Sequence, residues 1–181
     1  MKYISTAIVS IFILFLLSGC LTCEKKEYLF ELKSDGSGKL TITYFNIMSS
    51  MEDGVDMTQK DYTELTSDYI EGNKLQEDFP NCKIKKYKLF EKDGLLNGKV
   101  TIYFKKLEDV NIYQHQGKGP YMLSLCDFSE NYVSSNGSYG DEAMPVVFWE
   151  KGLKELKLTT SIDEPGEDNI SLIDEHKSFK N

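Results

Sequence analysis

Two segments of the sequence, 28–45 and 87–104, carry nearly the same pattern. Each contains Leu-Phe-Glu, then Asp-Gly, then Gly-Lys followed by Leu or Val and by Thr, and each ends in Tyr-Phe. Alternating apolar and polar residues on both sides of a Gly-rich turn are typical of a β-hairpin. The sequence therefore predicts two antiparallel hairpins, closed by Asp35-Gly36-Ser37-Gly38 and by the Asp93–Gly98 segment.

The alternation also predicts which side of these strands is buried. Because side chains along a strand point to opposite faces in turn, residues two apart share one face. Ile42 and Ile102 fall on the apolar faces, whereas Thr41 and Thr101 fall on the opposite ones. The likeness of the two segments reflects either a duplication or two hairpins that obey the same physics, and we favour the second explanation.

A helix is predicted between the hairpins, from about Thr58 to Gly72. Its first residues, 58–61, resemble a capping box with Asp61 in the place of Glu, and apolar residues then recur at helical spacing. Shorter helical turns are expected at 74–79 and 107–110. Further strands are expected around 121–125, 145–149 and 156–159.

These elements predict an α+β fold. We expect a mainly antiparallel sheet built from hairpins, with one principal helix packed on one face as a two-layer sandwich. Part of the element order also fits a ferredoxin-like β-α-β-β-α-β arrangement, and a small β-barrel or sandwich with a helix at one end is the main alternative. The acidic segment 163–181 is predicted to be a flexible tail.

The beginning of the chain predicts where the protein resides. Lys2 is followed by an apolar run from Ile4 to Leu17 and then by Leu17-Ser18-Gly19-Cys20, a combination typical of a secretory signal. This ending resembles the lipobox of bacterial lipoprotein precursors at all four positions. The resemblance implies cleavage before Cys20 and acylation of that residue. The alternative is an uncleaved anchor helix.

The resemblance also divides the chain. It implies a signal peptide at 1–19, a lipidated Cys20 with a tether at 20–26, and a single α+β domain at 27–162 ahead of the tail. The protein is then exported and held on a membrane by its acyl chains. In a Gram-negative host this would be the outer membrane, because Leu21 replaces the Asp that favours inner-membrane retention in the family.

The charge argues against nucleic acid as a partner. The chain has 29 acidic and 21 basic residues, and every basic residue is Lys. Readout of guanine and bidentate clamping of phosphate both rely on Arg. A chain with net charge −8, or −9 once Lys2 is removed with the signal, is predicted not to bind DNA or RNA.

Neither the cysteines nor the histidines match a metal or catalytic pattern. With Cys20 lipidated, Cys82 and Cys126 are the favoured disulfide pair, and the alternative is that both are small apolar side chains. The chain has only two His residues, which match no zinc or triad spacing. The Gly36–Lys39 segment is a hairpin turn and not a phosphate-binding loop. We therefore predict no cofactor, no metal and no catalytic residue.

One loop is a candidate for partner binding. The segment 132–140 combines two tyrosines with Ser, Asn and Gly, which are the residues of adaptable recognition surfaces. An ordinary long hairpin turn would have the same composition. If a partner docks on this domain, the predicted contact residues are Tyr132, Asn136, Tyr139 and Trp149.

The predicted function is non-catalytic binding or scaffolding at the membrane surface. A hydrolase of envelope polymers that uses carboxylates and a carrier of a lipid or another apolar ligand are the alternatives. A hydrolase requires carboxylates that converge in a cleft, at least one of them desolvated. A carrier requires an apolar cavity between helix and sheet, and a binding module requires an open sheet with exposed aromatic residues.

Overall fold

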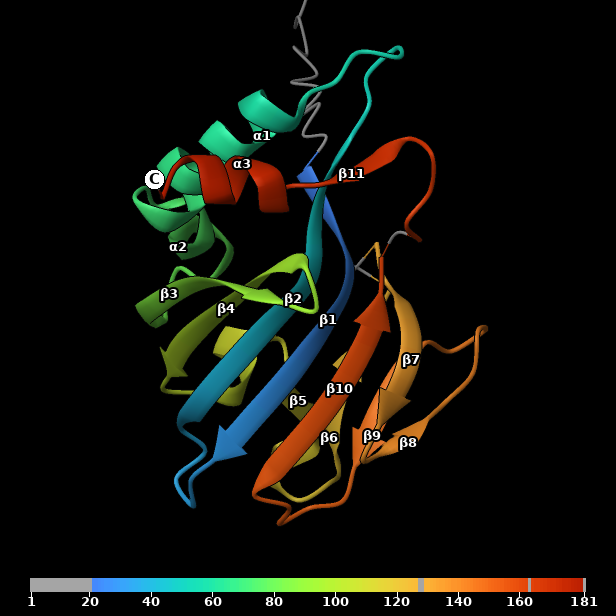
Figure 1. Cartoon of the computed structure of the whole chain (residues 1–181). Coiled ribbons are helices and arrows are strands. Elements are labelled where there is room, and N and C mark those ends of the chain that lie inside the picture. The colour runs from blue at the N-terminus through green and yellow to red at the C-terminus, as the bar shows by residue number, and fades with distance from the viewer. Residues whose placement is uncertain (1–20, 127–128, 163, 181) are drawn as a thin grey trace, which may run out of the picture.

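The two predicted hairpins form the centre of the fold. The computed structural model describes residues 21–126, 129–162 and 164–180. In it β1 (Leu21–Leu32) pairs antiparallel with β2 (Gly38–Ser50), and β3 (Lys83–Lys92) pairs antiparallel with β4 (Leu95–Phe104) (Figure 1). Asp93 and Gly94 close the second hairpin with φ values of 55° and 77°, the geometry of a two-residue type I′ turn. This turn is shorter than predicted because residues 95–98 already belong to β4.

The main sheet places the two hairpins side by side. Its strand order is β3-β4-β2-β1-β10-β7, with β10 at Glu155–Ser161 and β7 at Asn131–Ser135, and the pairings are antiparallel. Ile42 lies opposite Val100 and Leu40 opposite Ile102. Since Ile42 and Ile102 are 2% and 0% exposed, the predicted buried face is confirmed.

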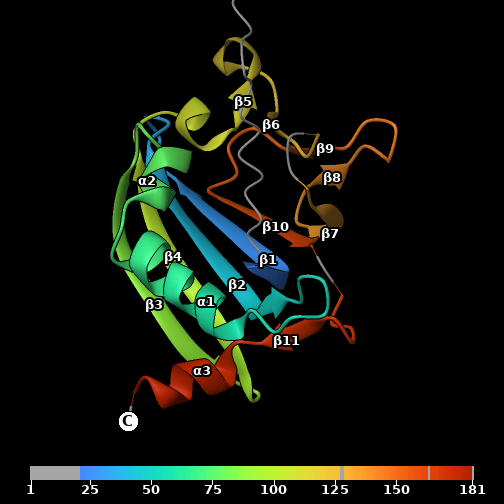
Figure 2. The ribbon, with the colours of Figure 1, turned by 90° about the horizontal axis from the view of Figure 1, so that it is seen from above.

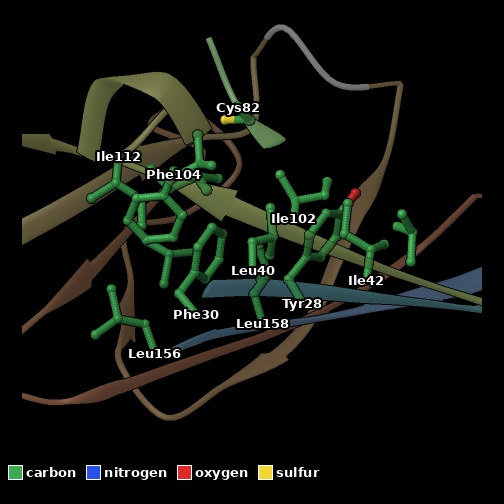
Figure 3. Packing of buried hydrophobic residues seen from close by; sticks show 14 of the residues in the cluster. Tyr28, Phe30, Leu40, Ile42, Cys82, Ile102, Phe104, Ile112, Leu156 and Leu158 are labelled. Carbon is green, nitrogen blue, oxygen red and sulfur yellow. The ribbon is translucent and has the colours of Figure 1, made fainter. Parts of the chain in front are cut away.

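A second sheet covers part of the inner face, the side of the main sheet that carries Ile42 and Ile102. It has the order β5-β6-β9-β8, formed by Tyr113–Gln114, Tyr121–Ser124, Val146–Trp149 and Ser138–Tyr139. It lies behind the main sheet in Figure 1 and to one side of it in Figure 2. Buried side chains of both sheets join in one cluster, which includes Phe30, Leu40 and Leu156 of the main sheet and Trp149 of the second sheet. Figure 3 shows Phe30, Leu40 and Leu156 in this cluster, together with Ile112 from the segment before β5.

The second sheet corrects the predicted two-layer sandwich. The fold is mostly antiparallel sheet with few helices, as an α+β class requires, but two sheets share the core. The reason is that the segment after β4 supplies its own buried strand residues. Among them are Leu123, Val147 and Trp149, which cover apolar surface that a single helix was expected to cover.

Short helices cover another part of the inner face (Figure 2). α1 (Thr58–Glu64) runs directly into the π-helix η1 (Leu65–Ile70), and α2 (Lys74–Asp78) follows. Tyr62 and Leu65 pack against Ile47 and Leu96 of the sheet. A helical segment thus occupies 58–70 of the predicted 58–72, but only its first seven residues are α-helix and the rest is π-helix. The short 3-10 helix η2 (Leu107–Val110) lies in the connection to the second sheet, and η3 (His115–Gly117) lies between its strands β5 and β6.

The predicted capping box at the start of α1 does not form. Asp56, which precedes the helix, accepts the backbone N–H of Thr58 at 2.8 Å and so satisfies the helix start. Asp61 instead lies fully buried, where its carboxylate accepts the hydroxyl of Ser49 at 2.5 Å. A side chain taken into the core is not available to cap the helix end.

Both ends of the described chain belong to the fold, which corrects two predictions. Residues 21–26 are not a tether, because they form the first half of β1. Within the predicted tail 163–181, the described residues 164–180 are not a flexible tail: β11 (Asn169–Ser171) pairs with β2, and α3 (Ile173–Ser178) packs against α1. Leu172, between these elements, is 0% exposed. Its burial stabilises an otherwise acidic and polar segment.

Candidate functional site

An open cavity lies between the inner face of the main sheet and the helices. It has a volume of about 300 Å³ and is lined by parts of β1, β2, β3, β4, η1 and α2. Most of its walls are aliphatic or aromatic, including Leu21, Ile47, Leu65, Tyr69, Leu75, Tyr87 and Leu89. We call it the inner cavity.

A glycine leaves room on the floor of the inner cavity. Gly98 of β4 lies opposite Tyr44 of β2 in the sheet register. A Cβ at Gly98 would lie 3.0 Å from Cδ1 of Ile47 and 3.6 Å from Cδ2 of Leu89, so any side chain here would occupy space between these two residues. The absence of a side chain at this point therefore helps to keep the cavity open.

A second cavity of about 540 Å³ adjoins the first. The two share Lys26, Tyr44, Leu75 and Asp78 as lining residues. The second cavity continues toward the connection between the two sheets, where it is lined by further residues that include Tyr28, Phe79, Ile112, Tyr113 and Glu130. The junction of the two cavities is the place where apolar walls and charged side chains meet.

Glu130 is the central charged group of the second cavity. Its side chain is only 6% exposed, and its Oε1 accepts a hydrogen bond and ion pair from Nζ of Lys26 at 2.6 Å. Both carboxylate oxygens accept the hydroxyl of Tyr28 at 2.9 Å, and Oε2 also accepts the hydroxyl of Thr160 at 2.6 Å. Three donors, Lys26, Tyr28 and Thr160, thus hold this carboxylate in place. Burial, with the charge of Glu130 added to it, raises the pKa of Tyr28.

Asp78 is the second carboxylate at the junction. Desolvation raises the pKa of its carboxyl above the ordinary value, while the positive charge of Lys26 acts in the opposite direction. Nζ of Lys26 also lies 5.5 Å from the ring centroid of Tyr44, within the range of a cation–π contact. Lys26 therefore links both carboxylates to the aromatic wall.

The predicted partner-binding loop is fastened to the domain. Trp149 is 1% exposed, which corrects the prediction that it is presented to a partner. Oδ1 of Asn136 accepts the indole N–H of Trp149 at 2.9 Å and the backbone N–H of Lys157 at 2.7 Å. Tyr132 and Tyr139 stack on each other with ring centroids 4.0 Å apart. Asn136 thus contacts Trp149, and Tyr132 contacts Tyr139, so these side chains help to fasten the loop to the fold.

The predicted disulfide is not formed. Cys82 is buried, with its thiol 3.4 Å from the carbonyl oxygen of Asp109, whereas Cys126 is exposed, and both are free thiols. Burial raises the pKa of the Cys82 thiol, so this cysteine acts as a small apolar side chain. The alternative left open by the sequence, a small apolar side chain, is therefore observed for Cys82 but not for the exposed Cys126. The predicted lipidation site, Cys20, lies outside the described residues.

The residues that shape the cavities had no signal in the sequence. Lys26 and Glu130 are 104 positions apart, and Asp78 lies in a helix of five residues. In the described part of the chain no three His, Cys, Asp or Glu side chains gather as a metal site would require. Nor does any helix among residues 21–126, 129–162 and 164–180 have the length and apolar character needed to span a membrane.

Comparisons of this chain with protein-family models, with curated proteins and with solved structures found no match. The charged lining residues of the inner cavity are Lys26, Lys88, Lys99 and Asp78, and Glu130 lines the adjoining cavity. A mostly apolar cavity with these charged groups can hold a molecule with an apolar body and a polar end.

Proposed function

We propose that this chain is a lipid-anchored cell-envelope protein of non-catalytic type, which binds an apolar or amphipathic ligand in the inner cavity. The observation that carries the proposal is the cavity between helices and sheet. Its volume of about 300 Å³, with about 540 Å³ adjoining it, falls in the range of small-molecule sites. Such sites combine apolar walls with a few placed polar groups, which Lys26 and Asp78 would provide here.

Binding accounts for the carboxylates better than hydrolysis does. A general acid or base must exchange a proton with the substrate, and so it needs a free oxygen within reach. Both oxygens of Glu130 already accept hydrogen bonds from the protein. Asp78 alone is not a pair of catalytic carboxylates of the kind that glycoside hydrolysis uses.

The anchoring part of the proposal rests on Leu17-Ser18-Gly19-Cys20 and on the position of the folded domain. β1 begins at Leu21, directly after the predicted acylation site. Two or three acyl chains on Cys20 would hold the domain on the membrane without an intervening tether. In a Gram-negative host we expect the outer membrane.

The ligand proposal can be tested with a fluorescent apolar probe. The chain from residue 20 onward, carrying Cys20→Ser, contains every described element and can be titrated with anilinonaphthalene sulfonate, with palmitate as competitor. The change Gly98→Leu places a side chain in the inner cavity, next to the flexible end of Ile47. We expect it to weaken probe binding about tenfold or more, equivalent to about 1.4 kcal/mol.

The matched control is Gly166→Leu. Gly166 is exposed, and the nearest atom to a Cβ there is the carbonyl oxygen of Glu164 at 3.9 Å. Probe binding should be unchanged in this variant, and circular dichroism should show both variants folded. If the probe and palmitate bind Gly98→Leu as tightly as the unchanged chain, the ligand does not occupy the inner cavity.

Processing is tested separately on the full chain. We expect mass spectrometry of the protein isolated from its membrane to show a chain that begins at an acylated Cys20, and we expect Cys20→Ser to stay unprocessed or to leave the membrane. An unmodified Cys20 in the native protein would refute the anchoring.

A further inference from the structure

One hairpin of this acidic protein is strongly basic. Residues 83–106, which comprise β3, β4 and the two residues after them, contain eight lysines and two acidic residues, a net charge of +6. The rest of the sequence therefore carries −14. We call residues 83–106 the basic hairpin. A charge asymmetry of this size within one domain indicates a surface that meets an anionic partner.

The fold directs several of these lysines to the same side. Val100 and Ile102 of β4 are buried on the inner face, so the residues between them point to the opposite, outer face. Lys88 lies opposite Lys99, and Lys86 lies opposite Thr101, in the register of β3 with β4. Directly opposed residues share one face of a sheet, and all three lysines are exposed. Lys88 and Lys99 also belong to the lining of the inner cavity, which β3 and β4 border. Like charges placed opposite each other destabilise a sheet, which calls for a functional reason.

Aromatic rings accompany the lysines. Nζ of Lys88 lies 5.8 Å from the ring centroid of Phe90, and Nζ of Lys85 lies 6.0 Å from that of Tyr103. Tyr103 itself is 44% exposed. Among the described residues none of the lysines of the basic hairpin forms an ion pair, whereas Glu91 pairs with Lys177 of α3. Exposed lysines interleaved with aromatic rings have the composition of a surface that lies against lipid headgroups.

The basic hairpin is close to the predicted anchor. Two lysines lie over the ring of Phe45 in β2. Nζ of Lys25 in β1 is 4.6 Å from the ring centroid, and Nζ of Lys92, near the tip of the hairpin, is 6.0 Å from it. Lys25 is four residues after Leu21, about 13 Å along an extended strand. Figure 1 shows the β3–β4 turn in the same half of the molecule as the start of β1, and the β1–β2 turn at the opposite end.

We infer that the basic hairpin docks on the anionic lipid headgroups of the membrane that holds the anchor. Lysine suits this partner, because a diffuse layer of phosphates requires point charges and not the bidentate geometry of Arg. Each lysine near an anionic membrane surface strengthens binding about fivefold at physiological salt. An alternative explanation is that lysines keep an edge strand from pairing with another chain. This accounts for the lysines of β3, which is an edge strand, but not for Lys99 on β4 or Lys25 on β1.

Amine footprinting of the full chain in vesicles tests this inference, which rests on the proposed anchoring but not on a ligand in the cavity. The protein is reconstituted into vesicles of phosphatidylcholine alone or with phosphatidylglycerol, and its lysines are acetylated. We expect Lys86, Lys88 and Lys99 to react about fivefold or more slowly in the anionic vesicles and to lose this protection at high salt. Lys33, Lys118 and Lys154, exposed elsewhere, should react equally in both.

Charge reversal provides the matched variants. Lys86→Glu, Lys88→Glu and Lys99→Glu together should abolish the protection of Lys83 and Lys85, two of the five lysines that remain in the basic hairpin. The same three-charge reversal at Lys33, Lys118 and Lys154 should leave it intact. Circular dichroism would show that both variants fold.

The outcomes separate the two proposals. Equal reactivity of the basic hairpin in both vesicles, in a protein that floats with them, overturns the docking and leaves the anchoring in place. Protection that arises only when a soluble polyanion is added also overturns it and assigns a polymer as the partner. A protein that floats with neither vesicle overturns the anchoring and the docking together.

Discussion

Replacing Leu172 with Ala tests whether the last residues of the chain belong to the folded core. Leu172 is 0% exposed, it packs with Tyr62 and Leu96, and its N–H donates to the carbonyl of Ile47 at 3.0 Å. The change removes three carbons, worth roughly 0.8 kcal/mol each in transfer free energy, and leaves a void that adds a further penalty. We expect the free energy of unfolding to fall by about 3–4 kcal/mol.

Urea unfolding measures this loss. Trp149 is the only tryptophan and is buried in the other hydrophobic cluster, so its fluorescence reports global unfolding. With a slope of about 2 kcal/mol per molar urea, the midpoint should fall by about 1.5–2 M while the slope stays the same. The control Val55→Ala alters a side chain that is 58% exposed and should change stability by less than about 0.5 kcal/mol. If Leu172→Ala is as stable as this control, α3 is not docked and the segment is the flexible tail that its composition predicts.

Three further changes test the sheet and the docking of α3. Ile102→Ala should lower the free energy of unfolding by about 2–5 kcal/mol, because it empties a buried position. Thr101→Ala, on the outer face of the same strand, should lower it by less than about 1 kcal/mol. Equal losses for the two variants in urea unfolding would contradict the register. Gly94→Val forces a β-branched residue to a φ of 77° and should lower the free energy of unfolding by about 1–3 kcal/mol. An unchanged melting temperature in this variant would rule out the type I′ turn. His176 is buried with a lowered pKa, chiefly because of desolvation, so the folded state binds fewer protons than the unfolded state as the pH falls below 6.5. The free energy of unfolding should therefore decrease between pH 7 and pH 5, and His176→Gln should lack the part of this decrease that His176 causes. If the urea midpoints of the two proteins change in parallel from pH 7 to pH 5, this reasoning is refuted.

The sequence by itself determined the elements whose forces are local. The turn at Asp93-Gly94 needs only residues that accept a positive φ, and the alternation around Ile42 and Ile102 needs only the pleat of a strand. The helix over 58–72 was likewise predicted from its spacing. The anchoring prediction depends on a motif read along the chain, Leu17 to Cys20, and it remains a prediction because those residues lie outside the described structure.

Only the tertiary structure decided what these elements enclose. The contact of Lys26 with Glu130 joins positions 104 apart, and no local pattern encodes such a pair. β11 and α3 are too short to show a period, so their burial around Leu172 follows from the docking surface that β2 and α1 provide. Gly98 falls opposite Tyr44, and the side chain that it lacks helps to keep the inner cavity open beneath the helices. A glycine shows in a sequence only that a side chain is missing, and the packing around it decides whether the missing volume becomes a site.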